Sequence, residues 1–200
     1  MPIGKGGMAE VFKAYDPQLD RFVALKMINL QTGDRSVYIK RFEREAKALA
    51  RLSHPHIVKI YDYGINDDVP FLVMEYLPGG TLRDQVKACL PYQQAARLLL
   101  PIAQALDYAH HNNIIHRDVK PANILFSESG EPLLSDFGII KLVGGDQTNL
   151  TGSGIVIGTS DYMPPEQWTG SASPQSDIYA LGVIYFQMLT GKLPYQSSNA

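Results

Sequence analysis

The sequence predicts an α+β fold with a small β-rich first part and a larger helical second part. Up to residue 76, short apolar and β-branched runs surround one amphipathic stretch, a pattern typical of strands around a single helix. Beyond the break Leu77-Pro78-Gly79-Gly80, apolar residues recur mainly at helical spacing. We therefore expect two domains, residues 1–77 and residues 78–200.

The first domain is expected to contain strands on both sides of one helix. Residues 11–15 and 22–28 read as strands of a hairpin, because the turn residues 16–20 separate them. From Tyr38 to Leu52 apolar residues recur at helical spacing, which predicts an amphipathic helix. Residues 57–63 and 70–76 are further strand candidates.

The second domain is expected to be built on two long helices. One runs from about Tyr92 to His111, with an expected kink at Pro101. Its apolar face comprises Leu98, Ile102, Ala105, Leu106 and Ala109. Residues 114–140 read as short strands and tight loops, and residues 141–175 as a long loop. Residues 177–190 are apolar nearly all round, which predicts a helix buried on most sides and ended by Gly191.

The composition narrows the class of protein. The 200 residues are 45% hydrophobic, which is enough for a sizeable core. A formal charge of -2 offers no bulk attraction to nucleic acid or anionic lipid. A single cysteine, Cys89, cannot form an internal disulfide. No apolar run approaches the length of about 20 residues that spans a bilayer. We expect no membrane segment in this chain and a cytoplasmic location.

Two clusters in the first domain carry chemistry. Three glycines, Gly4, Gly6 and Gly7, stand just ahead of a strand, where backbone N–H groups could approach a phosphate. A plain turn is the alternative interpretation. Lys26 lies inside an apolar strand, where its charge needs a partner, and Glu45 on the apolar stripe of the following helix is a candidate. The alternative is two unrelated surface residues.

Two clusters in the second domain follow. The run from His116 to Asn123 (His-Arg-Asp-Val-Lys-Pro-Ala-Asn) lies between core-like segments and predicts a polar loop on a rigid base. Asp136-Phe137-Gly138 places a second carboxylate nearby in the sequence. One aspartate, Asp118, could act on a hydroxyl nucleophile, while Asp136 and Asn123 offer oxygen ligands to Mg²⁺.

Together these motifs resemble a protein kinase catalytic domain. The glycine loop, Val-Ala-Leu-Lys, helix glutamate, His-Arg-Asp, Asp-Phe-Gly and Pro-Pro-Glu appear in family order between residue 3 and about residue 195. The resemblance implies a bilobal kinase-like fold, with a β-rich N-lobe and a helical C-lobe. Lys-Pro after His-Arg-Asp is similar to serine/threonine kinases, and several other phrases look like the bacterial, eukaryotic-type members.

The resemblance also implies a role for each site residue. Asp118, Lys120, Lys26 and Glu45 would be catalytic, and Asn123 and Asp136 would bind Mg²⁺. ATP would be held by residues of the glycine loop, the sheet, the interlobe connection and the C-lobe: Ile3, Gly4, Lys5, Gly6, Gly7, Met8, Ala9, Glu10, Val11, Ala24, Lys26, Met74, Glu75, Leu77 and Leu125. The partners would be proteins bearing Ser or Thr, and similar kinases often dimerise through the N-lobe.

Regulation is expected in the activation segment, residues 136–166. Arg117 before Asp118 is typical of kinases in which an arginine pairs with a phosphate on this segment. Thr151 and Ser153 are the favoured phosphorylation sites, by their distance from Gly158. Both could instead be ordinary polar loop residues.

The chain departs from the family pattern at a few places. Ala9 replaces the third glycine of the loop, and Pro164-Pro165-Glu166 replaces Ala-Pro-Glu. The strand that leads into the glycine loop is expected to be reduced to Pro2-Ile3. The resemblance implies a domain truncated at both ends, so that the C-lobe is incomplete, Glu166 lacks its usual arginine partner, and a longer gene product could be tethered to a membrane. The alternatives are a nucleotide-binding pseudokinase or scaffold, an inactive truncated fragment, and a small-molecule phosphotransferase, which the activation segment disfavours.

Overall fold

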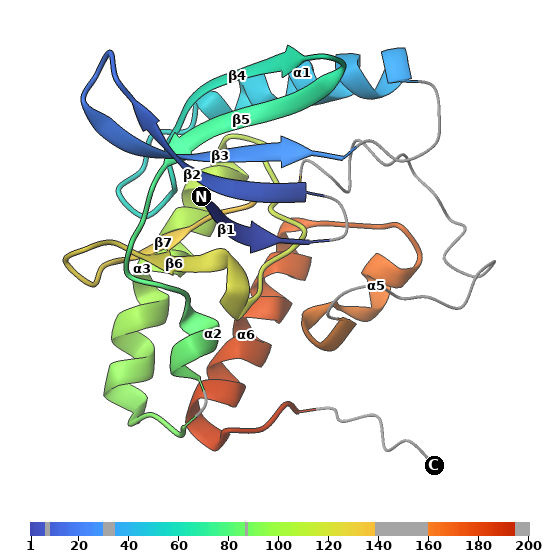
Figure 1. Ribbon diagram of the computed structural model, residues 1–200. Helices are drawn as coiled ribbons and strands as arrows, with labels where there is room; N and C mark the ends of the chain where they lie inside the picture. Colours follow the sequence, from blue (N-terminus) through green and yellow to red (C-terminus); the bar gives the residue numbers. More distant parts are fainter. Residues whose placement is uncertain (7–8, 30–34, 87, 139–159, 195–200) are drawn as a thin grey trace. The chain divides into compact units, whose positions relative to one another are not determined.

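The chain forms two compact units. A computed structural model describes residues 1–6, 9–29, 35–86, 88–138 and 160–194 (Figure 1). Among the described residues, the first unit comprises Met1–Ser53, Ile57–Leu77 and Gly138, and the second comprises His54–His56, Pro78–Phe137 and residues 160–194. Strands dominate the first unit and helices the second, so the predicted α+β class is confirmed.

The first unit is built on a five-stranded antiparallel sheet. Its strands are β1 (Pro2–Lys5), β2 (Ala9–Asp16), β3 (Arg21–Ile28), β4 (Ile60–Asn66) and β5 (Val69–Glu75), in the order β1-β2-β3-β5-β4 (Figure 1). The predicted hairpin is confirmed as β2 and β3. Its turn forms because the Asp16 carboxylate accepts the N–H groups of Gln18 at 3.1 Å and Leu19 at 3.3 Å.

Two strand boundaries differ from the expectation. β4 starts at Ile60 instead of Ile57, because its ladder with β5 begins only where Ile60 pairs with Met74. β1 extends to Lys5, two residues beyond the expected Pro2-Ile3 strand, because Gly4 and Lys5 still pair with β2. Gly6 is therefore preceded by a paired strand.

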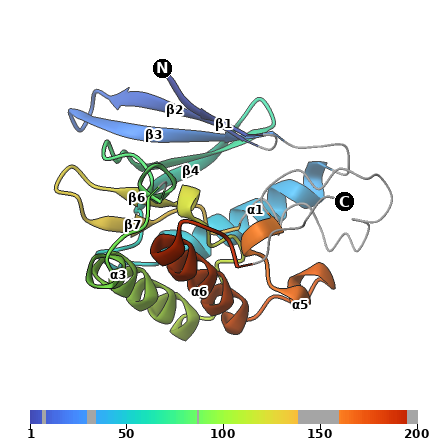
Figure 2. The same ribbon diagram turned by 90° about the horizontal axis from the view of Figure 1, so that it is seen from below.

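One helix, α1 (Arg35–Ala50), packs against β4 and β5 (Figures 1 and 2). Its buried residues are Phe42, Ala46 and Leu49, which lie on one face at helical spacing. The Phe42 ring contacts the Tyr63 ring of β4 edge-on, with centroids 6.3 Å apart. The predicted apolar stripe is confirmed, and the helix begins three residues before the predicted Tyr38.

The second unit is organised by two long helices that lie side by side, α3 (Tyr92–His111) and α6 (Pro174–Thr190) (Figures 1 and 2). The α3 bounds are those predicted, and the helix is continuous through Pro101. Leu99 is buried where Leu98 was expected, and Leu98 is half-buried. Gly191 ends α6 with a left-handed φ of 68°. Short elements complete the unit: α2 (Leu82–Gln85), a 3-10 helix (Pro121–Asn123), β6 (Ile124–Phe126) and β7 (Pro132–Leu134).

The predicted long loop is wrong for its second half. Within residues 160–175 a 3-10 helix (Ser160–Tyr162), α5 (Pro165–Trp168) and the first residues of α6 are formed. Pro165 and Pro174 occupy first-turn helix positions, where proline favours helix initiation. Residues 141–159 of that prediction lie outside the described residues. Of the helices that the structure describes, none is long and apolar enough to cross a membrane.

Candidate active site

The second unit gathers three of the predicted site residues in one loop. The Asp118 carboxylate lies 2.7 Å from Lys120 Nζ and accepts a hydrogen bond of 3.0 Å from Asn123 Nδ2. Asn123 Nδ2 also donates to the backbone oxygen of Asp118 at 2.8 Å. The Asp118 and Lys120 side chains are 23% and 24% exposed, so solvent reaches both groups. The loop therefore presents a carboxylate acceptor, a cation and an amide within a few ångströms.

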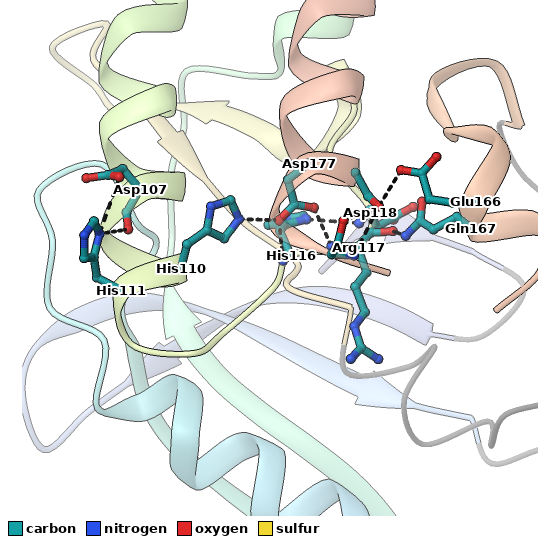
Figure 3. Close-up of polar contacts among 11 residues, drawn as sticks. Asp107, His110, His111, His116, Arg117, Asp118, Glu166, Gln167 and Asp177 are labelled. Carbon is teal, nitrogen blue, oxygen red and sulfur yellow. Dashed lines mark hydrogen bonds and ion pairs between the residues drawn. The ribbon is translucent and has the colours of Figure 1, made fainter. Parts of the chain in front are cut away.

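A buried carboxylate of α6 holds the start of this loop. Asp177 is 1% exposed and accepts hydrogen bonds of 2.8 Å from the backbone N–H groups of His116 and Arg117 (Figure 3). His110 Nε2 on α3 contacts the same carboxylate at 2.8 Å. Asp177 thus ties α3 and the loop to α6, and it satisfies two backbone donors that lie in no helix or strand.

His116 is fully buried beneath the loop. Its Nδ1 accepts the Asp118 N–H at 3.2 Å and its Nε2 donates to the Ser135 carbonyl at 2.8 Å, a pattern that requires the neutral ring. Burial lowers the pKa of His116, although the Asp177 carboxylate opposes this shift. The ring also packs on Phe137, with centroids 4.5 Å apart. His116 therefore connects the loop to the Asp136-Phe137-Gly138 segment.

The predicted magnesium ligands, Asn123 and Asp136, are brought close to one another. Ser135, the neighbour of Asp136, donates to the Asn123 carbonyl from its backbone N–H at 2.8 Å and from Oγ at 3.0 Å. Asp136 has a left-handed φ of 59°, which is uncommon for a residue other than glycine. Mg²⁺ uses one or two protein carboxylates with water and phosphate oxygens, so this small oxygen set fits the ion. Among the described residues, no three His, Cys, Asp or Glu side chains form a metal cluster.

In the first unit, one sheet face carries four predicted nucleotide-binding residues. Val11 lies opposite Lys26, and Ala24 lies opposite Met74. Directly opposed residues of an antiparallel pair share a face, as do residues two apart on one strand. Lys26, Ala24 and Met74 are buried, and Val11 is half-buried. The sheet register thus places a lysine beside three apolar side chains.

Helix α1 covers the same face of the sheet. Tyr63 lies opposite Leu72, and Leu72 lies opposite Lys26, so all three share a face. The contact between Phe42 and Tyr63 sets α1 on that face. Glu45, three residues beyond Phe42, is on the adjoining part of the helix surface. This arrangement favours the expected contact between Lys26 and Glu45.

The structure records an ion pair between Glu45 and Arg44. Arg44 Nη2 lies 2.8 Å from Glu45 Oε1, and the Glu45 side chain is 21% exposed. The pair between Lys26 and Glu45 stays a prediction.

The remaining predicted residues are distributed as follows. Ile3, Gly4 and Lys5 are in β1, Ala9 and Glu10 are in β2, and Gly6 lies between these strands. The Glu75 N–H donates to the Lys59 carbonyl at 2.9 Å. Leu77 follows β5 in the first unit, and Leu125 is in β6 of the second unit. Gly7, Met8, Thr151 and Ser153 lie outside the described residues.

Sequence reasoning missed the residues that support the loop. Asp177, His110 and Gln167 each bind it or its anchor, and only the place of Asp177 in an apolar helix is a signal in the sequence. Glu166 has a hydrogen-bond partner that the sequence did not predict, while the expected lack of its usual arginine partner stays a prediction. Ser176 Oγ donates to Glu166 Oε1 at 2.9 Å, because the first turn of α6 lies beside α5.

Comparison with known proteins identifies the class. The family profile of the protein kinase domain matches residues 1–200, and the chain belongs to this family. It is 42% identical over 201 residues to the serine/threonine-protein kinase PrkC of Bacillus subtilis (strain 168). It is 43% identical over 202 residues to the probable serine/threonine-protein kinase PknB of Lactococcus lactis subsp. lactis (strain IL1403). It is 39% identical over 201 residues to the serine/threonine-protein kinase PknL of Mycobacterium bovis (strain ATCC BAA-935 / AF2122/97).

These matches cover 99% of this chain in each case. They cover 31% of PrkC, 32% of this PknB and 50% of PknL. The chain therefore spans between about a third and half of the length of these curated relatives. The predicted resemblance to bacterial serine/threonine kinases is confirmed.

Proposed function

We propose that this chain is an ATP-dependent protein kinase that transfers the γ-phosphoryl group of ATP to serine or threonine hydroxyls of proteins. The observation that carries the proposal is the Asp118 carboxylate, set 2.7 Å from Lys120 Nζ and 3.0 Å from Asn123 Nδ2 in one anchored loop. Phosphoryl transfer needs positioned groups and charge neutralisation more than covalent chemistry. This loop supplies both.

Each loop residue then has a step. Asp118 accepts the proton of the substrate hydroxyl while the hydroxyl oxygen forms a bond to the γ-phosphorus. At the same time the bond between the γ-phosphorus and the β–γ bridging oxygen breaks, which leaves ADP. Lys120 offsets the charge on the transferred group. Asn123 and Asp136 would hold Mg²⁺, which when bound neutralises phosphate charge.

The first unit would bind the nucleotide. The glycine loop, residues 3–11, would cover the phosphates, and Lys26 would contact the α and β phosphates while paired to Glu45. The apolar face with Val11, Ala24 and Met74 supports adenine binding, because a flat aromatic base packs well on small apolar side chains. The backbone of Glu75 and Leu77 would bind the edge of the base, and the family resemblance adds Leu125 as a further ATP-binding residue.

Regulation and assembly are further parts of the proposal. A phosphate on Thr151 or Ser153 would pair with Arg117, since an arginine binds a phosphate dianion through two parallel hydrogen bonds. We also propose a homodimer through the first unit and a cytoplasmic position that a longer gene product tethers to the membrane. Sedimentation equilibrium on the chain tests the dimer, and cell fractionation with the longer product tests the tether.

Activity is tested with the full 200-residue chain and an Asp118→Asn variant, each incubated with Mg²⁺, ATP and a generic basic protein. Asparagine keeps the size of the side chain but cannot accept the hydroxyl proton, so phosphate transfer should fall about 10²–10⁴-fold. The matched control is Asp107→Asn, because Asp107 is a 74% exposed residue of α3 outside the loop. It should retain the parent rate. Mass spectrometry locates any phosphate on Thr151 and Ser153.

The binding of ATP, measured by calorimetry, separates the alternatives. Binding without transfer in the folded parent would refute the kinase proposal and support the nucleotide-binding scaffold. Equal transfer by the parent and the Asp118→Asn variant would refute the role of Asp118.

A further inference from the structure

We infer that Gln167 is a positioning residue: its side-chain amide holds the Arg117 carbonyl and so fixes the direction of Asp118. This inference rests on the proposed function, because the role of Asp118 as proton acceptor comes from that proposal. Gln167 is in α5, fifty positions from Arg117 in the sequence. No motif of the sequence analysis includes it.

The two polar backbone groups of Arg117 are held by side chains from two different helices. Gln167 Nε2 donates to the Arg117 carbonyl at 3.0 Å, and Asp177 Oδ1 accepts the Arg117 N–H at 2.8 Å (Figure 3). Gln167 comes from α5 and Asp177 from α6. The N–H and the carbonyl of Arg117, on either side of its α-carbon, are therefore both held by hydrogen bonds.

The backbone of Arg117 needs these two hydrogen bonds to keep its conformation. Its φ of 67° lies in the left-handed region, which a residue with a Cβ adopts only when the surrounding structure holds it there. The peptide that carries the Arg117 carbonyl also carries the Asp118 N–H. Rotation of this peptide would redirect Asp118 and break its 2.7 Å contact with Lys120. The hydrogen bond from Gln167 opposes that rotation.

Gln167 itself stands on a fixed support. Its neighbour Glu166 accepts a hydrogen bond of 2.9 Å from Ser176 in the first turn of α6. The Ser171 N–H donates to the Glu166 carbonyl at 3.2 Å. α5 is thus hydrogen-bonded to α6, the helix that provides Asp177. The two residues that hold the Arg117 backbone, Gln167 and Asp177, therefore come from helices that are joined to each other.

Three substitutions of Gln167 distinguish the effect of its hydrogen-bond donor from the effect of its side-chain shape. Gln167→Met keeps the length and removes the donor, Gln167→Glu turns an oxygen toward the carbonyl, and Gln167→Lys restores a donor. We expect kcat to fall about tenfold in Gln167→Met and further in Gln167→Glu. Displacement of a catalytic group by an ångström can lower the rate about 10²-fold. Lys should recover part of the loss. The KM for ATP should stay within about twofold.

The matched control is Gln175→Met, because Gln175 is an exposed glutamine of α6. Its kcat should equal that of the parent. Circular dichroism establishes that each variant is folded before its kinetics are compared.

A double-mutant cycle with Arg117→Gly distinguishes positioning from general stability. Glycine adopts a φ of 67° without strain, so a glycine at position 117 depends less on the hydrogen bond from Gln167. In the Arg117→Gly background the effect of Gln167→Met on kcat should shrink from about tenfold to about twofold. A merely structural role would give the same factor in both backgrounds.

Hydrogen exchange provides a readout that does not depend on activity. In Gln167→Met the amides of Arg117 and Asp118 should exchange faster, while those of α3 keep the parent rate. Unchanged exchange, or equal kcat in the parent and the Met and Glu variants, would overturn the inference. A parent that transfers no phosphate would refute the proposed function instead, and exchange would still decide whether Gln167 holds the loop.

Discussion

Replacing Asp177 by alanine should destabilise the second unit strongly. The substitution removes the acceptor of three hydrogen bonds of 2.8 Å, donated by His110, His116 and Arg117, at a site where the carboxylate is 1% exposed. A buried donor without a partner costs about 1–3 kcal/mol, so the loss is at least about 3 kcal/mol. In a chain of this size about 1 kcal/mol shifts Tm by about 2–4 °C. We therefore expect Asp177→Ala to melt at least about 6–12 °C below the parent.

The assay is thermal unfolding followed by circular dichroism at the helix band, because α3 and α6 dominate the helical signal of the second unit. Asp107→Ala is the matched control. Asp107 also contacts a histidine, His111, at 3.4 Å, but both side chains are about three-quarters exposed. Such surface pairs contribute about 0–1 kcal/mol, so Tm should change by less than about 4 °C.

A third variant tests the geometry of the anchor. Asp177→Asn keeps the shape and one acceptor oxygen, but its amide N–H₂ faces a donor, so its Tm should lie between those of the parent and of Asp177→Ala. If Asp177→Ala melts within the range of Asp107→Ala, the carboxylate does not hold the loop as the hydrogen bonds indicate, and the reasoning fails.

Three further predictions concern stability. Burial lowers the pKa of His116 below its ordinary value of 6.5, so the unfolded chain binds the proton more readily and stability falls as pH drops below about 6.5. Tm should be lower at about pH 5.5 than at about pH 7.5, and His116→Gln should reduce this difference. Phe42→Ala should lower the free energy of unfolding by about 3–5 kcal/mol in urea titration, because the ring is fully buried. Gly79→Ala should lower Tm, because the new Cβ would lie 2.6 Å from two backbone oxygens, whereas Gly182→Ala has open space and should raise stability by about 1 kcal/mol.

Each of these predictions has an outcome that contradicts it. A pH dependence that is the same in the parent and in His116→Gln would assign the titration to another group, such as His54, whose pKa burial also lowers. Val37 is 42% exposed on the same helix as Phe42, so Val37→Ala must be near neutral for the Phe42 result to report burial. Equal Tm values for the two glycine variants would refute the close approach at Gly79.

The parts of the fold set by local pattern could be predicted from the sequence. The bounds of α3 follow from one apolar face at helical spacing, and the β2–β3 hairpin follows from Asp16 and its turn. The end of α6 follows from Gly191, whose left-handed φ other residues rarely adopt. In each case the deciding interaction joins residues a few positions apart.

The parts set by long-range contacts could not be predicted in this way. The polar cluster around Asp118 was identified from its residues and its roles from the resemblance, but its anchor, Asp177, lies about sixty residues later in an apolar stretch. Gln167 and Ser176 have no periodic or motif signal, because their partners come from other segments. Short helices such as α5 also escape a periodicity argument, since four residues make a single turn.

The separation between His116 and its anchor has a consequence for the order of folding during synthesis. The acceptor of the His116 N–H is the Asp177 carboxylate, which is synthesised later because it is 61 positions further along the chain. At a translation rate of about 5–20 residues per second, this distance takes about 3–12 s to synthesise. Through that interval the β-rich first unit has all its strands while the loop has no anchor. A nascent chain on the ribosome therefore contains the strands of the first unit before the residue that anchors the Asp118 loop has been made.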